Sequence, residues 1–250
     1  MEQPVSLTAE SSSLGRIHLL LAVQSLVVVL VSINRLGSWT LGYIASNEFL
    51  RWVDLHNMLT LPLVSIVAFY LLKKVVEAEP LAADSKRGRT ARAQLWLNVA
   101  FIAGVYLLGA GYGDHEVTNY LHARFCGRGD VSALCRIVLF NDDDFSHWVF
   151  FAGFVLVNAA LMLLQALFPR SAPARGRDLA LLVLNGVLIG AGVFANLAFE
   201  RIGLDLYVVA LLAIIAFALL RRLGRQPLLV YYATAYGLGL VGTALYKTLR

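Results

Sequence analysis

Four of the five histidines in the sequence fall at three places that share one predicted side of the chain. They are His56, His115, His122 and His147. Carboxylates accompany them, since Glu116 follows His115 while Asp143 and Asp144 stand shortly before His147. Imidazole nitrogen and carboxylate oxygen are the ligands that zinc and iron take in proteins. The residue types therefore predict a divalent metal site, with zinc or iron as the expected cofactor.

Each residue in this group has an expected role. The expected metal ligands are His56, His115, His122, His147 and Asp144. Glu116 and Asp143 are the expected catalytic carboxylates, which would accept a proton from metal-bound water whose pKa the metal lowers to about 7. A ligating histidine also donates its second N–H to an acceptor, and the acidic run at residues 142–144 could supply one.

The spacing of these residues predicts how helices would present them. If the third apolar segment continues as a helix past Gly113, then His115, Asn119 and His122 share one face. Asn119 stands where a zinc-protease helix would carry its second histidine, so the H-E-x-x-H motif is absent. Two other interpretations stay open, namely a proton-handling polar cluster without metal and solvated helix ends with no special role.

The composition indicates which elements must position these residues. The 250-residue chain is 59% apolar and 15% charged, whereas soluble domains average about 45–50% apolar and about 25% charged. A soluble single-domain enzyme is therefore excluded. Segments of about 20 apolar residues can cross a bilayer as helices. The sequence predicts a single all-α domain over residues 1–250 with seven transmembrane helices, at about 17–34, 55–72, 93–113, 145–169, 179–199, 204–222 and 226–246.

The distribution of basic residues predicts the orientation of these spans. Thirteen of the 21 Lys and Arg residues lie on the side that includes the N-terminus, and eight lie on the other side. Because cytoplasmic connections are enriched in Lys and Arg, we expect a cytoplasmic N-terminus and an external C-terminus in a plasma or inner membrane. The net charge of +5 is then a signal of topology. The expected partner is membrane lipid, and no nucleic acid is expected.

The connection between the third and fourth spans contains both cysteines, Cys126 and Cys135. The charge count places this connection outside the cytoplasm, where disulfides form and persist. The sequence therefore predicts a disulfide between them. A separate segment, Arg35 to Asp54 between the first and second spans, is rich in aromatic residues and low in charge. This composition predicts an interfacial helix or lid.

In helix number and in its one-sided cluster of His and Asp, the sequence is similar to the seven-helix zinc lipid hydrolases that include alkaline ceramidases and adiponectin receptors. Those proteins place a His pair on a late helix, whereas the last three predicted spans contain no histidine. Membership in that group is therefore not inferred.

Three functions are compared on this basis. The preferred one is a metal-dependent hydrolase or oxidative enzyme that acts on a lipid or other hydrophobic substrate at the outer leaflet. A single-haem or quinone-linked redox protein, or a non-catalytic subunit of a membrane complex, is the alternative. A coupled transporter is disfavoured, because no ionisable residue lies in the middle of a predicted span.

Overall fold

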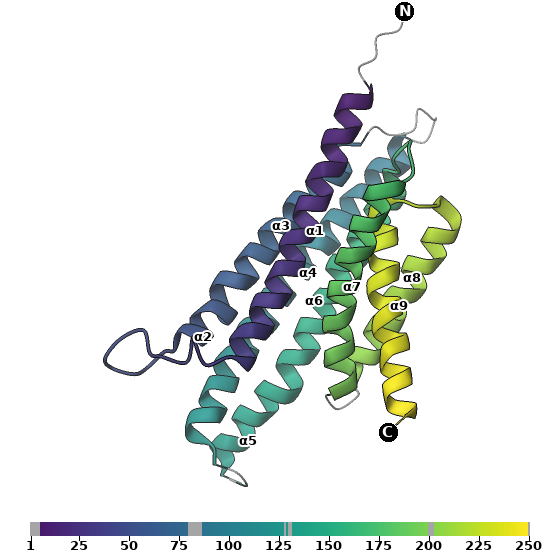
Figure 1. Ribbon diagram of the computed structural model, residues 1–250. Coiled ribbons are helices and arrows are strands. Elements are labelled where there is room, and N and C mark those ends of the chain that lie inside the picture. Colours follow the sequence, from purple (N-terminus) through teal and green to yellow (C-terminus); the bar gives the residue numbers. More distant parts are fainter. Residues whose placement is uncertain (1–5, 80–86, 128, 130–131, 200–202, 250) are drawn as a thin grey trace, which may run out of the picture.

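Seven long helical rods run side by side in the computed structural model (Figure 1), which describes residues 6–79, 87–127, 129, 132–199 and 203–249. They are α1 (Ser6–Leu36), α2–η1–α3 (Trp52–Leu55, His56–Thr60 and Leu61–Glu77), α4 (Arg87–Phe125), α5–η2–α6 (Ala133–Phe140, Asn141–Phe145 and Ser146–Leu167), α7 (Gly176–Phe199), α8 (Leu204–Leu223) and α9 (Pro227–Thr248). All seven are long and apolar enough to cross a membrane. The predicted all-α fold, with seven helices of the length and apolarity that a membrane span needs, is thereby confirmed.

Local sequence signals begin and end several of these helices. Ser132 caps α5 by accepting a hydrogen bond from the backbone N–H of Cys135 at 3.2 Å. Pro227 opens α9, where its missing N–H costs nothing. Gly224 follows α8 at φ 73°, a backbone conformation that favours glycine. These residues explain why the connection before α5 and the connection between α8 and α9 are short.

Several helices extend beyond the apolar stretches that predict them. The helix α4 continues twelve residues past Gly113 to Phe125, and the fourth rod begins at Ala133, well before residue 145. The apolar criterion ends at the first charged residues, but backbone hydrogen bonding does not. Charged turns at the end of a spanning helix can lie in the headgroup region. These extra turns carry the histidines and acids described below.

The closest helix pair is α4 with α6, followed by α7 with α9. Glycines lie where these helices cross. A Cβ atom on Gly111 would lie 2.4 Å from the backbone nitrogen of Phe150, and one on Gly153 would lie 2.3 Å from that of Leu108. Small residues let helix backbones approach in this way. The α4–α6 pair is therefore held together by backbone-level contact.

The small-residue spacing of Gly186 and Gly190 likewise indicates a packing face on α7. A Cβ atom on Gly186 would lie 2.9 Å from the carbonyl oxygen of Tyr231, and one on Gly190 would lie 2.9 Å from that of Ala235. Both carbonyls belong to α9, so the spacing marks the real contact between α7 and α9.

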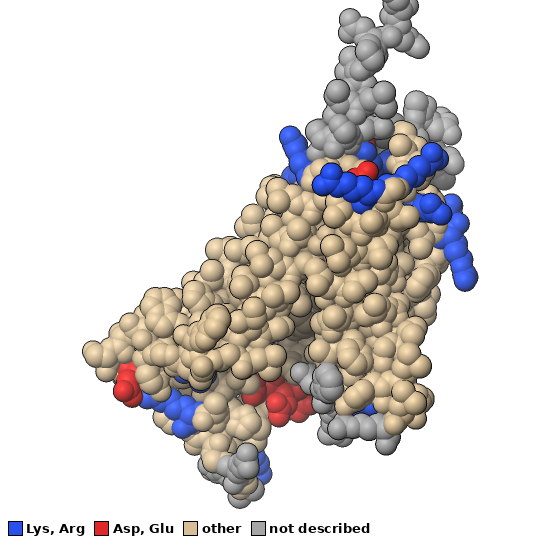
Figure 2. Space-filling view, in the orientation of Figure 1, with Lys and Arg blue, Asp and Glu red and all other residues tan. Residues whose placement is uncertain are grey.

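The two ends of the bundle differ in charge (Figure 2). We call the end at which α1 begins the basic end, because most of the visible Lys and Arg side chains gather there. We call the opposite end, at which α9 finishes, the histidine end. Acidic side chains lie at the histidine end beside a hollowed part of the surface. Lys86, Arg128, Arg201 and Arg250, which the sequence count includes, lie outside the described residues.

A buried ion pair ties the basic end together. The Arg170 guanidinium contacts the Glu79 carboxylate at 2.5 Å, and Ser13 contacts both groups at 2.5 and 2.6 Å. The Gln226 side chain bonds the backbone N–H and C=O of Arg170. Buried charges are tolerated when paired and hydrogen-bonded in this way. The network joins α1, α3 and α9 to the connection that follows α6.

The aromatic segment before α2 is not the helix that its composition suggests. Residues 37–51 form an irregular loop that projects sideways from the bundle (Figure 1), and a single bridge pairs Tyr43 with Arg51. Trp39 and Phe49 are 90% and 71% exposed. The backbone carbonyl of Glu48 accepts hydrogen bonds from Arg124 and Tyr120. The backbone of the loop is thus anchored to α4, and the rings of Trp39 and Phe49 point outward. That these rings lie at the membrane–water interface remains a prediction.

Candidate functional site

Two π-helical turns interrupt the rods at the histidine end. The turn η1 lies between α2 and α3, the turn η2 lies between α5 and α6, and both pack against α4. A π turn inserts one extra residue, which rotates the following side chains by about 100° relative to an uninterrupted α-helix. Such turns occur frequently at functional sites. Because both π turns contact α4, a functional site is expected on this helix.

One carboxylate in η2 connects two histidines of α4. The Nδ1 atom of His122 lies 3.1 Å from Oδ2 of Asp142. The Nδ1 atom of His115 lies 3.1 Å from Oδ1 of Asp142 and 3.2 Å from its backbone oxygen. The two histidines are two turns apart, about 10.5 Å along the axis, so a carboxylate between them can reach both. Asp142 itself is 1% exposed.

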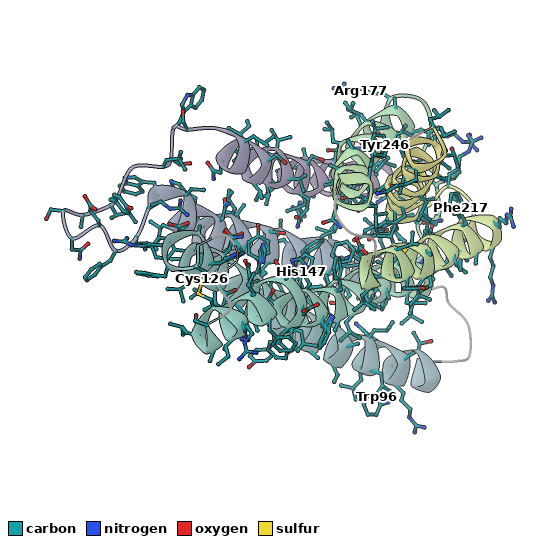
Figure 3. All side chains as sticks on the ribbon, turned by 90° about the horizontal axis from the view of Figure 1, so that it is seen from below. Trp96, Cys126, His147, Arg177, Phe217 and Tyr246 are labelled. Carbon is teal, nitrogen blue, oxygen red and sulfur yellow. A yellow bond between two sulfur atoms is a disulfide. The ribbon has the colours of Figure 1, made fainter. Side chains whose placement is uncertain are left out.

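A third imidazole adjoins this pair. The ring of His147 lies 4.9 Å from that of His115, centroid to centroid. Seen from the histidine end, His147 lies near the middle of the view, whereas Cys126 lies further toward the edge (Figure 3). The hydroxyl of Ser146, which is fully buried, donates to the Asp142 carbonyl at 2.7 Å. The α6 side of the site is thus held against η2.

Two further acids of α4 lie at the same level. Asp114 interacts electrostatically with both His115 and Asp142, and its Oδ2 atom is buried without a hydrogen-bond partner among the described residues. Glu116 is 6% exposed and has a polar partner. We call the set of His115, His122, His147, Asp142 and Asp114 the histidine cluster, and Glu116 is the neighbour of His115 on α4.

Asp143 and Asp144 do not join this cluster in the structure. Both are exposed on η2, and neither forms a hydrogen bond or ion pair with another described residue. Their spacing of four and three residues before His147 favours a shared face only in a continuous α-helix. The π turn changes that register, so Asp142, five residues before His147, is the acid that faces the histidines. The catalytic role of Asp143 and the ligand role of Asp144 remain predictions without a contact.

His56 also lies apart from the other three histidines. Its ring stacks on Trp52 at 5.9 Å between centroids, and its Nδ1 atom lies 3.4 Å from the Thr60 hydroxyl. The nearby Asn57 is 1% exposed and accepts a hydrogen bond from Asn34 at 3.1 Å. Arg51, just before α2, makes two side-chain contacts of 2.8 Å to Asp54, and this hydrogen bonding raises the pKa of Arg51. The polar residues around η1 thus pair with one another, and no contact joins His56 to Asp142 among the described residues.

Within the described part of the chain, no three His, Cys, Asp or Glu side chains are arranged as a metal site requires. The arrangement that is present is a carboxylate between two imidazoles. Because a carboxylate can only accept hydrogen bonds, the Nδ1 atoms facing Asp142 carry the protons. Each neutral ring then has Nε2 as its basic nitrogen, which can bind a proton or a metal ion.

The predicted disulfide between Cys126 and Cys135 is present. It joins the residue after α4 to the first turns of α5, which leads into η2. The bond therefore closes the connection between the two elements that carry His122 and Asp142.

Replacing both cysteines with serine is expected to lower the stability of the fold. Closing a loop of this length contributes about 2.7 kcal/mol in the chain-entropy model, so the apparent Tm should fall by several degrees. Thermal unfolding of the detergent-solubilised protein, with and without reductant, measures the effect. Reductant should lower the Tm of the wild type toward that of the variant, and equal Tm values under oxidising conditions would contradict the prediction.

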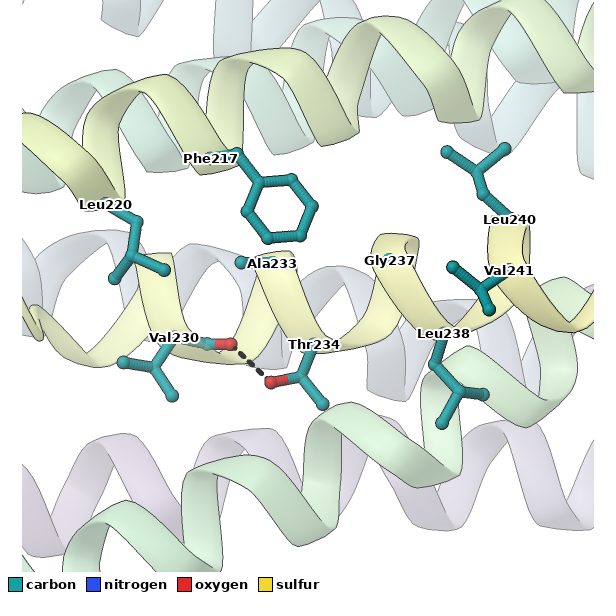
Figure 4. A pocket seen from close by; sticks show the side chains of 9 residues that line it. All are labelled: Phe217, Leu220, Val230, Ala233, Thr234, Gly237, Leu238, Leu240 and Val241. Carbon is teal, nitrogen blue, oxygen red and sulfur yellow. Dashed lines mark hydrogen bonds between the residues drawn. The ribbon is translucent and has the colours of Figure 1, made fainter.

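A groove between α8 and α9 is separate from the histidine cluster (Figure 4). Its volume is about 510 Å³, and its walls are mostly aliphatic, with Phe217 and Gly237 facing each other. Among the described residues that line it, Thr234 has a hydroxyl, which donates to the carbonyl of Val230 at 2.8 Å. No titratable side chain lines the groove. Its surface offers contact for lipid chains and no catalytic group.

The structure has seven helices long and apolar enough to cross a membrane and, at one end, a buried Asp142 in contact with two histidines. No protein-family model, curated protein or solved structure matches the chain. The function therefore has to be argued from the cluster itself.

Proposed function

We propose that this seven-helix protein is a membrane enzyme that acts on a lipid or other hydrophobic substrate at the histidine end of the bundle. One observation carries the proposal: the buried Asp142 carboxylate contacts Nδ1 of both His115 and His122 at 3.1 Å. Burying a charge is costly unless partners compensate it. Here the partners are titratable rings, and such groups gather at sites that move protons.

The contacts suit Asp142 for an orienting role. Its Oδ2 atom accepts from Nδ1 of His122 and its backbone carbonyl accepts from Nδ1 of His115, which also lies 3.1 Å from Oδ1. The ring geometry then directs both Nε2 atoms away from Asp142. In a hydrolytic reaction, one Nε2 would accept a proton as a water oxygen attacks the substrate carbonyl carbon. The same ring would return that proton to the leaving oxygen when the carbon–oxygen bond breaks. Asp142 would stabilise the imidazolium formed between these steps.

A divalent metal, zinc or iron, is the finer part of the proposal. Histidines that ligate metals usually donate their other ring N–H to a carboxylate, and His115 and His122 face Asp142 in that manner. Because Asp142 lies between the two rings and their Nε2 atoms point away from it, each ring would belong to a different ligand set. The Nε2 atom of His115 would be one ligand, and His147, whose ring lies 4.9 Å from that of His115, or Glu116 could join it after a side-chain rotation. When bound, the metal would supply activation of water at neutral pH.

We also propose that the histidine end faces away from the cytoplasm. In the sequence, thirteen of the 21 Lys and Arg residues fall on the side of the spans that includes the N-terminus and eight on the other, in keeping with the enrichment of Lys and Arg on cytoplasmic sides. The Cys126–Cys135 disulfide lies at the histidine end and requires an oxidising compartment. The substrate would then be reached from the outer leaflet.

Elemental analysis of the purified protein tests the metal. We expect about one zinc or iron per chain, and we expect Asp142→Asn to weaken metal affinity by about 10–100-fold. Asp178→Asn is the matched control, because Asp178 contacts His18 at 3.0 Å at the basic end and should leave the metal content unchanged. If the wild-type protein holds no metal after dialysis against excess zinc, the metal part of the proposal is wrong. If the purified protein has a haem absorption spectrum, the cofactor is haem and not zinc or non-haem iron.

A further inference from the structure

A second crevice lies between α3 and α4, toward the basic end and away from the histidine cluster. These two helices touch only slightly, and the space between them has a volume of about 470 Å³. Ile66, Phe101, Ile102 and Val105 line its apolar part, and the residues with polar groups are Lys73, Lys74, Asn98 and Tyr70. We call this space the α3–α4 crevice. Its lining suits an amphiphilic ligand, because charged side chains lie toward one end and apolar side chains line the rest.

The lysines leave the polar end of the crevice positively charged. Lys73 is buried and bonds Glu77 at 2.8 Å, and Gln94 donates to the same carboxylate at 3.1 Å. The charge of Lys73 is therefore compensated locally. Lys74 lies 3.9 Å from Glu77 and its side chain is 55% exposed. Two ammonium groups and one carboxylate thus leave one positive charge beside the crevice, which favours an anionic group.

Asn98 supplies a second and independent feature of the crevice. Its Oδ1 atom is buried and has no hydrogen-bond partner among the described residues. A polar group within a membrane span is costly when it is unsatisfied. Phe101, three residues later on α4, lies 5.8 Å from the Lys73 ammonium, measured to the ring centroid. The unsatisfied Asn98 amide oxygen therefore lies near the lysine end of the crevice, and a ligand with a hydrogen-bond donor could satisfy it.

We infer that the α3–α4 crevice binds one anionic phospholipid that carries a headgroup hydroxyl. The lipid phosphate lies at Lys74, and an acyl chain follows Ile66, Phe101 and Val105. The headgroup hydroxyl donates to the Asn98 Oδ1 atom once this side chain rotates and turns that buried atom toward the crevice. Phosphatidylglycerol has all three features, whereas phosphatidylcholine has no net charge and no donor. The inference does not depend on the proposed enzyme function, because the crevice and the histidine cluster share no residue.

Native mass spectrometry of the full-length protein tests this inference. The protein, released from detergent, is titrated with dioleoyl phosphatidylglycerol or with dioleoyl phosphatidylcholine. We expect one phosphatidylglycerol to bind about fivefold more tightly than phosphatidylcholine, the effect of one lysine at an anionic surface. Lys74→Gln should remove this preference, and Asn98→Leu should weaken phosphatidylglycerol binding. Arg222→Gln, an exposed basic residue at the end of α8, is the matched control and should change neither.

Thermal unfolding of each variant without added lipid separates binding from folding. Variants that unfold at the wild-type temperature but bind phosphatidylglycerol less tightly support the site. Equal binding of the two lipids by the wild type would overturn the inference. So would a preference that survives Lys74→Gln and Asn98→Leu, because it would indicate general lipid contact around the bundle. If Asn98→Leu fails to fold, the Lys74→Gln titration decides alone.

Discussion

Asp142→Asn is expected to slow the conversion of lipid by about 10–100-fold while leaving the seven-helix fold in place. Asparagine has the size of aspartate, but it offers one acceptor oxygen and one donor NH₂ group in place of two acceptor oxygens. It can accept from Nδ1 of His115 or of His122, but not from both. If the amide oxygen accepts from His122, the NH₂ group faces Nδ1 of His115, which keeps only its contact with the backbone carbonyl of residue 142. The basic nitrogen of one ring would then no longer be oriented by a carboxylate.

The control for this prediction removes a carboxylate–histidine contact elsewhere. Asp178→Asn alters the pair with His18 at the basic end and should leave the rate of lipid conversion at the wild-type value. The rates are compared in membranes that contain equal amounts of each variant, as judged by quantitative immunoblotting. Equal rates for wild type and Asp142→Asn would contradict the role assigned to Asp142.

Gly153→Ala is expected to destabilise the bundle more than any other single methyl group considered. The new Cβ would lie 2.3 Å from the Leu108 nitrogen and 2.7 Å from the Gly104 carbonyl oxygen. Both atoms belong to the backbone of α4, so relief requires α4 and α6 to move apart. Overpacking of this kind costs about 1–3 kcal/mol or more. The apparent Tm of the solubilised protein measures it.

Gly113→Ala on α4 provides the comparison, because nothing lies within 4 Å of the Cβ it would add. Alanine is favoured over glycine in a helix by about 1 kcal/mol, so this variant should unfold at the wild-type temperature or slightly above it. If Gly153→Ala matched Gly113→Ala, the close approach of α4 and α6 would be wrong. The same approach brings η2 to the histidines of α4.

The membrane architecture could be predicted because its cause is local. A run of apolar residues long enough to cross a bilayer satisfies its own backbone hydrogen bonds as a helix, so each span can be recognised without knowing its neighbours. The disulfide could be predicted from the two cysteines alone. The shared face of His115 and His122 required only that α4 continue past Gly113, as it does.

The partner of those histidines could not be predicted in the same way. Residues 141–144 read Asn-Asp-Asp-Asp, and α-helical spacing relative to His147 favours Asp143 and Asp144. The π turn shifts the register by one residue and selects Asp142. Such a turn depends on packing of η2 against α4, which a single sequence does not reveal. The run of acids was the available signal, but it did not distinguish its three members.

The separation of His56 from the cluster has a similar origin. Its place at the start of the second span suggests the same membrane depth as the other histidines, and depth can be read from the sequence. Its direction around the helix depends on η1 and on stacking with Trp52. Three of the four histidines predicted to act together therefore do lie together, whereas the fourth, His56, contacts Trp52 and Thr60.

The central claim is that the Asp142-oriented histidines convert a lipid or another hydrophobic substrate. Untargeted lipid mass spectrometry tests it most directly, on membranes from cells that produce the wild type, Asp142→Asn or Asp178→Asn at equal levels. We predict that one lipid class is consumed and its product accumulates with the wild type and with Asp178→Asn, but not with Asp142→Asn. Lipid profiles that are the same for all three proteins would contradict the claim.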